Sequence, residues 1–355
     1  MTAGKKLNTI FKTALDKDAS DIHVKAGTPP VLRIHRELFT QTDYPVLTPD
    51  DTAGLLNEIT TDTQKEIFNK TWELDFAYTL DHVGRFRVNA YLNTGTVSMV
   101  FRLVRSNIPT IEQLGLPPVC AEITKKREGL IILTGPTGCG KSTTLAAMLN
   151  YINHTVRRNI ITIEDPIEYL HIDDKSTFSQ REVGIDTHSF ADSLKHVFRQ
   201  DPDVILVGEI RDLETIAIAL TAAETGHLIL TTLHTPSSYE AIDRLIDAFP
   251  SQQHQQVRLQ LSTTLNAIVF QNLVPRNDKE GVVPAVEVLI ATPAIQNLIR
   301  EGKSYQMLNF MHSGQDVGMQ TIDQSLMELY RTGRISHREC FSRMRAPETI
   351  KKVGS

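Results

Sequence analysis

The sequence is poor in cysteine, and the few cysteines that it has are far apart. Cys120, Cys139 and Cys340 form no C-x-x-C pair. Disulfide-rich domains and zinc modules need several cysteines or paired ligands at short spacings, so neither class is expected. A reducing compartment is the simpler interpretation of this cysteine usage.

Long apolar runs are also absent, and neither sign of charge dominates. Residues 1–18 lack the apolar segment of a signal peptide, and no stretch approaches the ~20 apolar residues that cross a bilayer. The 42 acidic residues exceed the 37 basic ones, which gives a net charge of −5. A strongly basic surface for nucleic acid is therefore not indicated. We expect a cytoplasmic chain that binds no nucleic acid and contacts a membrane only through partner proteins.

What the sequence does contain is material for two globular domains. It has 355 residues, of which 41% are hydrophobic and 22% are charged. That length and balance suit two domains with separate cores. Residues 1–104 mix short strand-like alternations with helical periodicity, which predicts a small α+β domain. Residues 105–118 have the character of a linker.

Residues 119–355 follow a different pattern. Apolar runs at 130–133, 160–163, 204–207 and 228–231 alternate with helical stretches. Strands that are apolar throughout and are separated by helices indicate a mainly parallel sheet that is covered on both faces. From about residue 294 the pattern is helical. The predicted fold class is α/β, with the α+β domain preceding it.

A glycine-rich segment in the second domain carries the strongest functional signal. Residues 135–142 match G-x-x-x-x-G-K-S, with an expected strand at 130–134 and an expected helix at 142–152. Backbone N–H groups of such a loop and the helix N-terminus bind phosphates, and the lysine reaches the β- and γ-phosphates while the serine binds Mg²⁺. The predicted cofactors are ATP and Mg²⁺. The predicted nucleotide-binding residues are Gly135, Pro136, Thr137, Gly138, Cys139, Gly140, Lys141, Ser142 and Thr143.

Acidic residues follow two of the apolar runs. Glu164 comes directly after the run at 160–163, and Glu209 follows the run at 204–207. Ligands of α/β sheets lie at the carboxyl ends of the strands. Hydrolysis needs a carboxylate that orients or deprotonates water and an acidic contact to the metal ion. Glu164 and Glu209 are therefore candidate catalytic residues and, with Ser142, candidate Mg²⁺ ligands, direct or through water. Which of the two is the general base stays open.

Histidines and arginines complete the set of candidates. His234 follows the run at 228–231 and His227 precedes it. From their spacing alone, a structural role and a functional role are about equally expected for each histidine. Arg85, Arg87 and Arg102 lie on strand-like segments of the first domain. Arginines from another domain or subunit often stabilise a transferring phosphoryl group, although a solvated sheet face explains the same pattern and is the preferred interpretation of the pattern alone.

Several motifs together resemble the type IV pilus retraction ATPases, the PilT (twitching motility) family within the type II/IV secretion ATPase superfamily. The motifs span nearly the whole chain. They are Ala19-Ser20-Asp21-Ile22-His23, Gly84-Arg85-Phe86-Arg87-Val88-Asn89, the loop at 135–142, Ile163-Glu164-Asp165-Pro166-Ile167-Glu168, Gly208-Glu209-Ile210-Arg211-Asp212, Thr225-Gly226-His227, Thr232-Leu233-His234-Thr235 and Leu298-Ile299-Arg300-Glu301.

The resemblance implies a PAS-like N-terminal domain, a RecA-like motor domain and a homohexameric ring that holds ATP between the domains. It implies an ATP hydrolase that drives pilus retraction through an inner-membrane platform protein, at the inner face of the cytoplasmic membrane. A paralogous retraction ATPase is a candidate further partner. Arg85, Arg87 and Arg102 match arginines that approach phosphate. His227 matches a nucleotide contact and His234 a catalytic residue, and residues 298–301 match a motif needed for retraction rather than for hydrolysis.

Two other functions are considered beside this resemblance, and the sequence departs from the family pattern at two places. An assembly or secretion ATPase of the same superfamily usually carries an extra N-terminal domain and a C-x-x-C zinc element, and this chain shows neither. A RecA-like DNA-dependent ATPase is disfavoured because no basic, aromatic-interleaved tract is present. The departures are Ile34-His35-Arg36-Glu37, where an acidic-Gly pair is usual, and Thr235-Pro236-Ser237 after His234.

Overall fold

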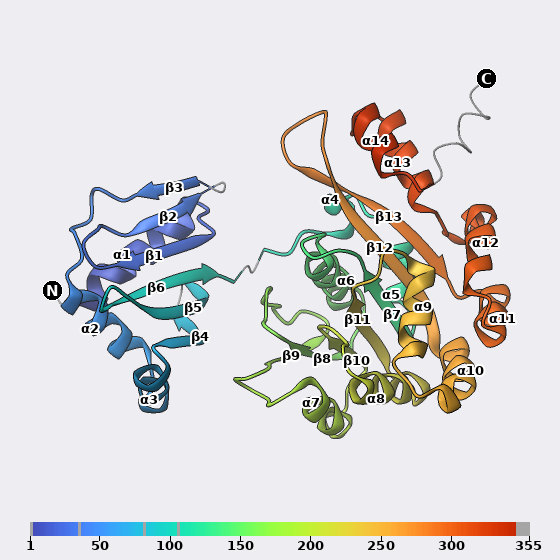
Figure 1. The fold of residues 1–355 in the computed structure, drawn as a ribbon, viewed down its shortest axis with the longest axis horizontal. Coiled ribbons are helices and arrows are strands. Elements are labelled where there is room, and N and C mark those ends of the chain that lie inside the picture. The colour runs from blue at the N-terminus through green and yellow to red at the C-terminus, as the bar shows by residue number, and fades with distance from the viewer. Residues whose placement is uncertain (1–2, 35–36, 81–82, 105–106, 346–355) are drawn as a thin grey trace. The chain divides into compact units, whose positions relative to one another are not determined.

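The computed structural model describes residues 3–34, 37–80, 83–104 and 107–345. The chain divides into two compact units, residues 1–106 and 107–355 (Figure 1). Residues 35–36, where a turn is expected and the sequence departs from the family pattern, lie outside the described residues, as do residues 105–106 of the expected linker.

The first unit is an antiparallel sheet with helices packed on it. Its strands lie in the order β3-β2-β1-β6-β5-β4, and each pairs antiparallel with its neighbours. The elements are α1 (Ala3–Asp16), β1 (Asp21–Lys25), β2 (Val31–Ile34), β3 (Glu37–Thr40), α2 (Pro49–Ile59), α3 (Asp62–Thr71), β4 (Glu73–Leu80), β5 (Gly84–Asn93) and β6 (Thr96–Leu103).

Aromatic rings from three of these elements form the centre of the first core. Phe11 of α1 packs against Phe86 of β5 at 4.8 Å between ring centroids and against Phe101 of β6 at 5.0 Å. Tilted and edge-to-face ring pairs at such distances stabilise a core beyond the area that they bury. Along β5, Phe86, Val88 and Ala90 are buried, whereas Arg85 and Arg87 lie on the other face. The strand therefore presents its arginines away from the core.

The second unit is built on a mainly parallel sheet with helices on both faces (Figure 1). The strand order is β13-β12-β7-β11-β10-β8-β9, and only β13 runs antiparallel to its neighbour. The strands are β7 (Gly129–Thr134), β8 (Asn159–Glu164), β9 (Thr177–Glu182), β10 (Val204–Val207), β11 (Leu228–Leu233), β12 (Leu265–Pro275) and β13 (Val282–Ile290).

The helices of the second unit cover both sides of this sheet. They are α4 (Ile111–Leu114), α5 (Val119–Thr124), α6 (Lys141–Thr155), α7 (Phe190–Val197), α8 (Leu213–Glu224), α9 (Ser238–Asp247), α10 (His254–Thr264), α11 (Pro293–Glu301), α12 (Met307–Ser313), α13 (Ile322–Arg331) and α14 (His337–Arg343). The predicted α/β class, with continuous apolar strands and a helical C-terminal part, is confirmed.

Alternation along the strands creates two cores. Ile132 and Ile205 face one core with α7 to α11, and Ile131 and Leu206 face the other with α5 and α6. Because both faces of the parallel strands are buried, the polar groups that bind a ligand can gather only at the strand ends. A separate cluster, which includes Phe270, packs α13 and α14 on β12 and β13. Among the described helices, none is long and apolar enough to cross a membrane.

Candidate functional site

The phosphate-binding loop, residues 135–142, connects β7 to α6. Gly135 has a φ of +141° and Gly140 a φ of +89°, values that side chains disfavour. A Cβ on Gly135 would lie 2.3 Å from the backbone oxygen of Gln271 and 2.9 Å from Cys139 Sγ. A side chain is thus excluded at Gly135 by both conformation and space. Gly140 leads directly into α6, so the N-terminus of that helix points into the loop.

Lys141 lies across this loop. Its Nζ donates to the carbonyl oxygens of Gly135 at 2.9 Å and Pro136 at 3.1 Å, and the residue is only 8% exposed. Burial lowers the pKa of its ammonium group. A partly desolvated ammonium held by backbone carbonyls attracts an anion more strongly than one in water, because the local dielectric constant is lower.

Gln271 of β12 holds the loop through its side-chain amide. Its amide nitrogen donates to the Cys139 carbonyl at 2.6 Å, and its amide oxygen accepts from Thr144 Oγ1 at 2.8 Å. Gln271 is buried, so both ends of the amide are satisfied away from water. One side chain therefore ties the middle of the loop to the first turn of α6. Sequence reasoning missed this residue.

Glu164 ends β8 beside the loop. Its Oε1 accepts from Thr162 Oγ1 at 2.6 Å and from Gln180 Nε2 at 3.2 Å. Burial raises the pKa of Glu164 to about 7 despite these two hydrogen bonds, which favour the ionised form. A carboxyl with a pKa near neutrality can exchange a proton at working pH.

Gln180 of β9 links Glu164 to the segment that contains Tyr169. Sequence reasoning did not predict a role for Gln180. The same Nε2 donates to the Tyr169 carbonyl at 2.9 Å, and the Tyr169 hydroxyl lies 2.9 Å from Thr143 Oγ1 on α6. His171, two residues after Tyr169, stacks on Phe178 at 4.3 Å between ring centroids, and burial lowers its pKa to about 4. Its ring is therefore neutral at physiological pH.

Glu209 and His234 follow the carboxyl ends of two neighbouring strands, β10 and β11. Glu209 Oε1 pairs with the Arg211 guanidinium at 2.7 Å, and its Oε2 lies 3.8 Å from His234 Nε2. His234 Nδ1 lies 3.5 Å from Lys141 Nζ. Burial, and next the positive charge of Lys141, lower the pKa of His234. The neutral imidazole thus lies between the lysine and the glutamate.

These groups line one cleft with a volume of about 490 Å³. Its lining includes residues of the phosphate-binding loop together with the strand-end acids and His234. The candidate residues that line it are Thr137, Gly138, Gly140, Lys141, Ser142, Thr143, Glu164, Glu209 and His234. The cleft is thus built from the segments that sequence reasoning selected for the second domain, and Arg211, Tyr169 and His171 line it as well.

His227 lies elsewhere in the second unit. Its carbonyl accepts from Gly129 N at the start of β7, and its ring packs against Phe198. His234 and the phosphate-binding loop lie at the other ends of β11 and β7, about 20 Å away at a strand rise of ~3.3 Å per residue. Within one chain, the structure does not bring His227 and the loop together.

The arginines that the structure describes in the first unit lie on one face of its sheet. Four residues that lie opposite one another in register form a row across the sheet: Arg33 on β2, Asp21 on β1, Arg102 on β6 and Arg87 on β5. Arg102 Nε donates to Asp21 Oδ1 at 2.8 Å, and Arg33 Nε lies 3.8 Å from Asp21 Oδ2. The Arg102 side chain is 64% exposed. Arg85 lies two residues from Arg87 on the same face of β5.

The family model for type II/IV secretion system proteins matches residues 2–302. The type IV pilus retraction ATPase PilT of Pseudomonas aeruginosa is 44% identical over 332 residues, which cover 94% of this chain and 96% of that protein. The type IV pilus ATPase PilU of the same organism is 40% identical over 349 residues, which cover 98% and 91%.

A solved structure of the pilus retraction motor PilT with bound ADP matches 97% of this chain and 98% of its own, with a TM-score of 0.89 and 44% identity. The sequence match and the fold match therefore extend through both units. The chain belongs to the type II/IV secretion system protein family, within its PilT branch of ATPases.

Proposed function

We propose that this chain is a homohexameric motor that couples hydrolysis of Mg–ATP to type IV pilus retraction. The observation that carries the proposal is the convergence of Lys141, Glu164, Glu209 and His234 in one cleft of a PilT-type chain. The motor acts on the pilus through an inner-membrane platform protein, at the inner face of the cytoplasmic membrane. A paralogue of the PilU kind is a candidate partner.

The phosphate-binding loop holds the β- and γ-phosphates of ATP. Its backbone N–H groups and the N-terminus of α6 supply an anion site, and Lys141 supplies a positive charge. Pro136, Thr137 and Cys139 contribute backbone to the loop, while Thr143 lies in the first turn of α6. The Lys141 contacts to Gly135 and Pro136 keep the ammonium at the centre of the loop.

The donor set of the cleft fits Mg²⁺. Ser142, Glu164 and Glu209 offer a hydroxyl and two carboxylates, which are the hard oxygen ligands that Mg²⁺ prefers. Among the described residues, no group of three or more His, Cys, Asp or Glu side chains could hold a metal alone. Mg²⁺ usually binds through one or two protein ligands plus substrate phosphates. When bound, Mg²⁺ neutralises charge that develops on the phosphates.

Glu164 and Glu209 have different surroundings, which support different roles. Glu164 accepts from neutral donors and has a pKa of about 7, which suits a group that takes a proton. The Glu209 carboxylate pairs with Arg211 and faces His234, which suits a group that orients water. We propose Glu164 as the proton acceptor and Glu209 as the orienting carboxylate.

Residues outside the cleft complete the site in the ring. Arg85, Arg87 and Arg102 are proposed to approach the γ-phosphate from the first domain, because their shared face carries an excess of positive charge. His227 lies at the far end of β11 from the loop, so a nucleotide contact of this residue requires a neighbouring subunit.

The test joins an ATPase assay with complementation of a cell that lacks its retraction ATPase. The wild-type chain is expected to hydrolyse ATP and restore twitching, whereas Lys141→Ala is expected to do neither. Lys175→Ala, which removes an exposed lysine from the same unit, is the matched control. Turnover by Lys141→Ala near that of the wild type would refute the loop assignment. Strong stimulation of turnover by single-stranded DNA would favour a DNA-dependent ATPase instead.

A further inference from the structure

The segment that carries His234 is fastened to the phosphate-binding loop on one side. We call residues 234–238, which comprise the connection from β11 and the first residue of α9, the His234 loop. Thr235 N donates to Thr134 Oγ1 at 2.9 Å, and the two threonine hydroxyls lie 2.7 Å apart. Thr134 is the last residue of β7 and directly precedes Gly135. The two loops therefore share an attachment at the strand end.

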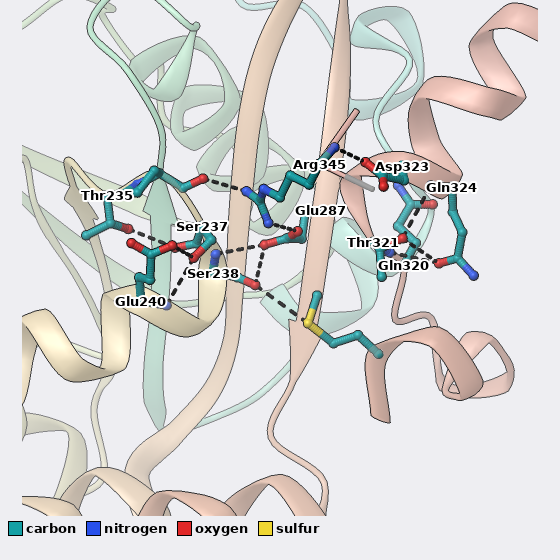
Figure 2. Close-up of polar contacts among 12 residues, drawn as sticks. Thr235, Ser237, Ser238, Glu240, Glu287, Gln320, Thr321, Asp323, Gln324 and Arg345 are labelled. Carbon is teal, nitrogen blue, oxygen red and sulfur yellow. Dashed lines mark hydrogen bonds and ion pairs between the residues drawn. The ribbon is translucent and has the colours of Figure 1, made fainter. Parts of the chain in front are cut away.

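A buried carboxylate holds the other side of the His234 loop. Glu287 of β13 is 0% exposed. Its Oε1 accepts from Ser238 N at 2.8 Å and Ser238 Oγ at 2.7 Å, and its Oε2 pairs with Arg345 at 2.7 Å (Figure 2). An ionised carboxylate in such a place is costly unless it is paired and hydrogen-bonded. These donors fix both Glu287 and the start of α9.

Arg345 reaches the loop itself. One terminal nitrogen of its guanidinium donates to Glu287 (Figure 2). The other terminal nitrogen donates to the Pro236 carbonyl. Its backbone N donates to Asp323 Oδ1 at 2.8 Å, and its guanidinium lies 5.1 Å from the centre of the Phe270 ring. The planar fork of arginine binds two acceptors in fixed directions, which an ammonium group does not do. Arg345 thus joins α13, β12 and β13 to a carbonyl two residues from His234.

We propose that Arg345 is a positioning residue for His234. It does not line the described cleft, and it acts by fixing the Pro236 carbonyl. The position of the His234 ring between Lys141 and Glu209 then depends on the C-terminal end of the second unit. This inference rests on the catalytic role proposed above for His234.

The test is a double-mutant cycle on full-length protein, with kcat and KM for ATP as readouts. Arg345→Gln in the wild-type background is expected to lower kcat on the order of tenfold, since small misplacements of catalytic groups have such effects. KM is expected to change less than twofold, because the phosphate-binding loop is untouched. In a His234→Ala background, the same substitution is expected to change kcat less than twofold, since no ring remains to be positioned.

Three variants keep the result interpretable. Arg343→Gln removes an arginine that pairs with Glu339 within α14, and its kcat is expected to match that of the wild type. Arg345→Lys is expected to recover only part of the lost kcat, because one ammonium cannot reproduce the fork. If Arg345→Gln fails to fold with Glu287 unpaired, the Arg345→Gln/Glu287→Gln pair removes the buried charge and serves in the same cycle.

Two outcomes would overturn the inference and leave the proposed function intact. One is a kcat of Arg345→Gln within twofold of the wild type. The other is an equal loss of kcat in both backgrounds, which indicates a structural effect that does not pass through His234. A wild-type kcat for His234→Ala would refute the proposed role of His234 and the inference with it.

Discussion

The raised pKa of Glu164 predicts a pH-dependent cost to folding that a single substitution removes. Its folded-state pKa is about 7, against an ordinary value of 4.5. The native state therefore holds the proton more tightly than the unfolded state, and stability falls as pH rises from 4.5 to about 7. Below 4.5 the carboxyl is neutral in both states and costs nothing. Above 7 the full cost of burying the charge is present.

The magnitude follows from the two pKa values. Each tenfold change in proton affinity is worth about 1.4 kcal/mol, so the gap corresponds to about 3 kcal/mol above pH 7. This is an upper limit, because the side chain is only partly buried and water reaches part of it. Glu164→Gln keeps Oε1 as the acceptor for Thr162 and Gln180 and removes the charge. The variant should therefore be more stable than the wild type at pH 8.

Calorimetry of the nucleotide-free chain between pH 4 and pH 8.5, with a chelator present, measures this effect. The melting temperature of Glu164→Gln is expected to equal that of the wild type near pH 4 and to exceed it at pH 8 by up to ~10 °C for a domain of this size. Glu280→Gln, on an exposed loop, removes the same charge and should leave the profile unchanged. The single tryptophan, Trp72, lies in the first unit, so its fluorescence follows a transition that should not respond.

Two results would refute this reasoning about Glu164. A stability difference that is constant across the pH range would mean that the carboxyl does not titrate in this window. Lower stability of Glu164→Gln at pH 8 would mean that the ionised carboxylate stabilises the fold, opposite to the sign worked out above.

Three further predictions follow from other residues of the second unit. Glu209→Gln should bind ATP with the affinity of the wild type and should not hydrolyse it. Equal losses in ATP affinity and kcat would argue against the proposal that Glu209 orients the attacking water. Gln271→Leu leaves the Cys139 carbonyl and the Thr144 hydroxyl without this hydrogen-bond partner, and should lower the free energy of unfolding by about 2–5 kcal/mol. An unchanged midpoint in denaturant unfolding would contradict this. Arg300 contacts Ser262 and Asn297, outside the cleft. Arg300→Ala should therefore keep ATPase activity but fail to restore twitching in the complementation assay. Full restoration of twitching would contradict the assignment of Arg300 to retraction.

Sequence reasoning located the parts of the cleft that depend on consecutive residues and on strand direction. The loop signature fixes Lys141 because the strand, the turn and the helix are contiguous. Glu164, Glu209 and His234 follow three apolar runs, and the carboxyl ends of parallel strands meet at one edge of a sheet. The same rule explains why His227 lies apart. It precedes its strand, so it belongs to the opposite edge.

Residues that brace the cleft from distant strands were not predictable in this way. Gln271 lies in β12, more than a hundred residues after the loop that it holds, and no local pattern encodes that pairing. A polar residue inside the apolar strand β12 does signal a buried group that needs partners, although it does not name them. Arg345 carries no such signal. Its contacts depend on how α13 and α14 pack on β12 and β13.

The arginine face of the first unit shows why one charge pattern can have two interpretations. Like charges directly opposite on neighbouring antiparallel strands destabilise a sheet, and Arg87 and Arg102 are such a pair. Asp21 compensates only part of this charge, because Arg33 and Arg102 share its carboxylate. If this face only contacted solvent, replacing one of these arginines with a neutral residue would increase the stability of the sheet. Retaining Arg85, Arg87 and Arg102 on one face is favourable where an anion approaches it, which supports the proposal that these arginines meet the γ-phosphate.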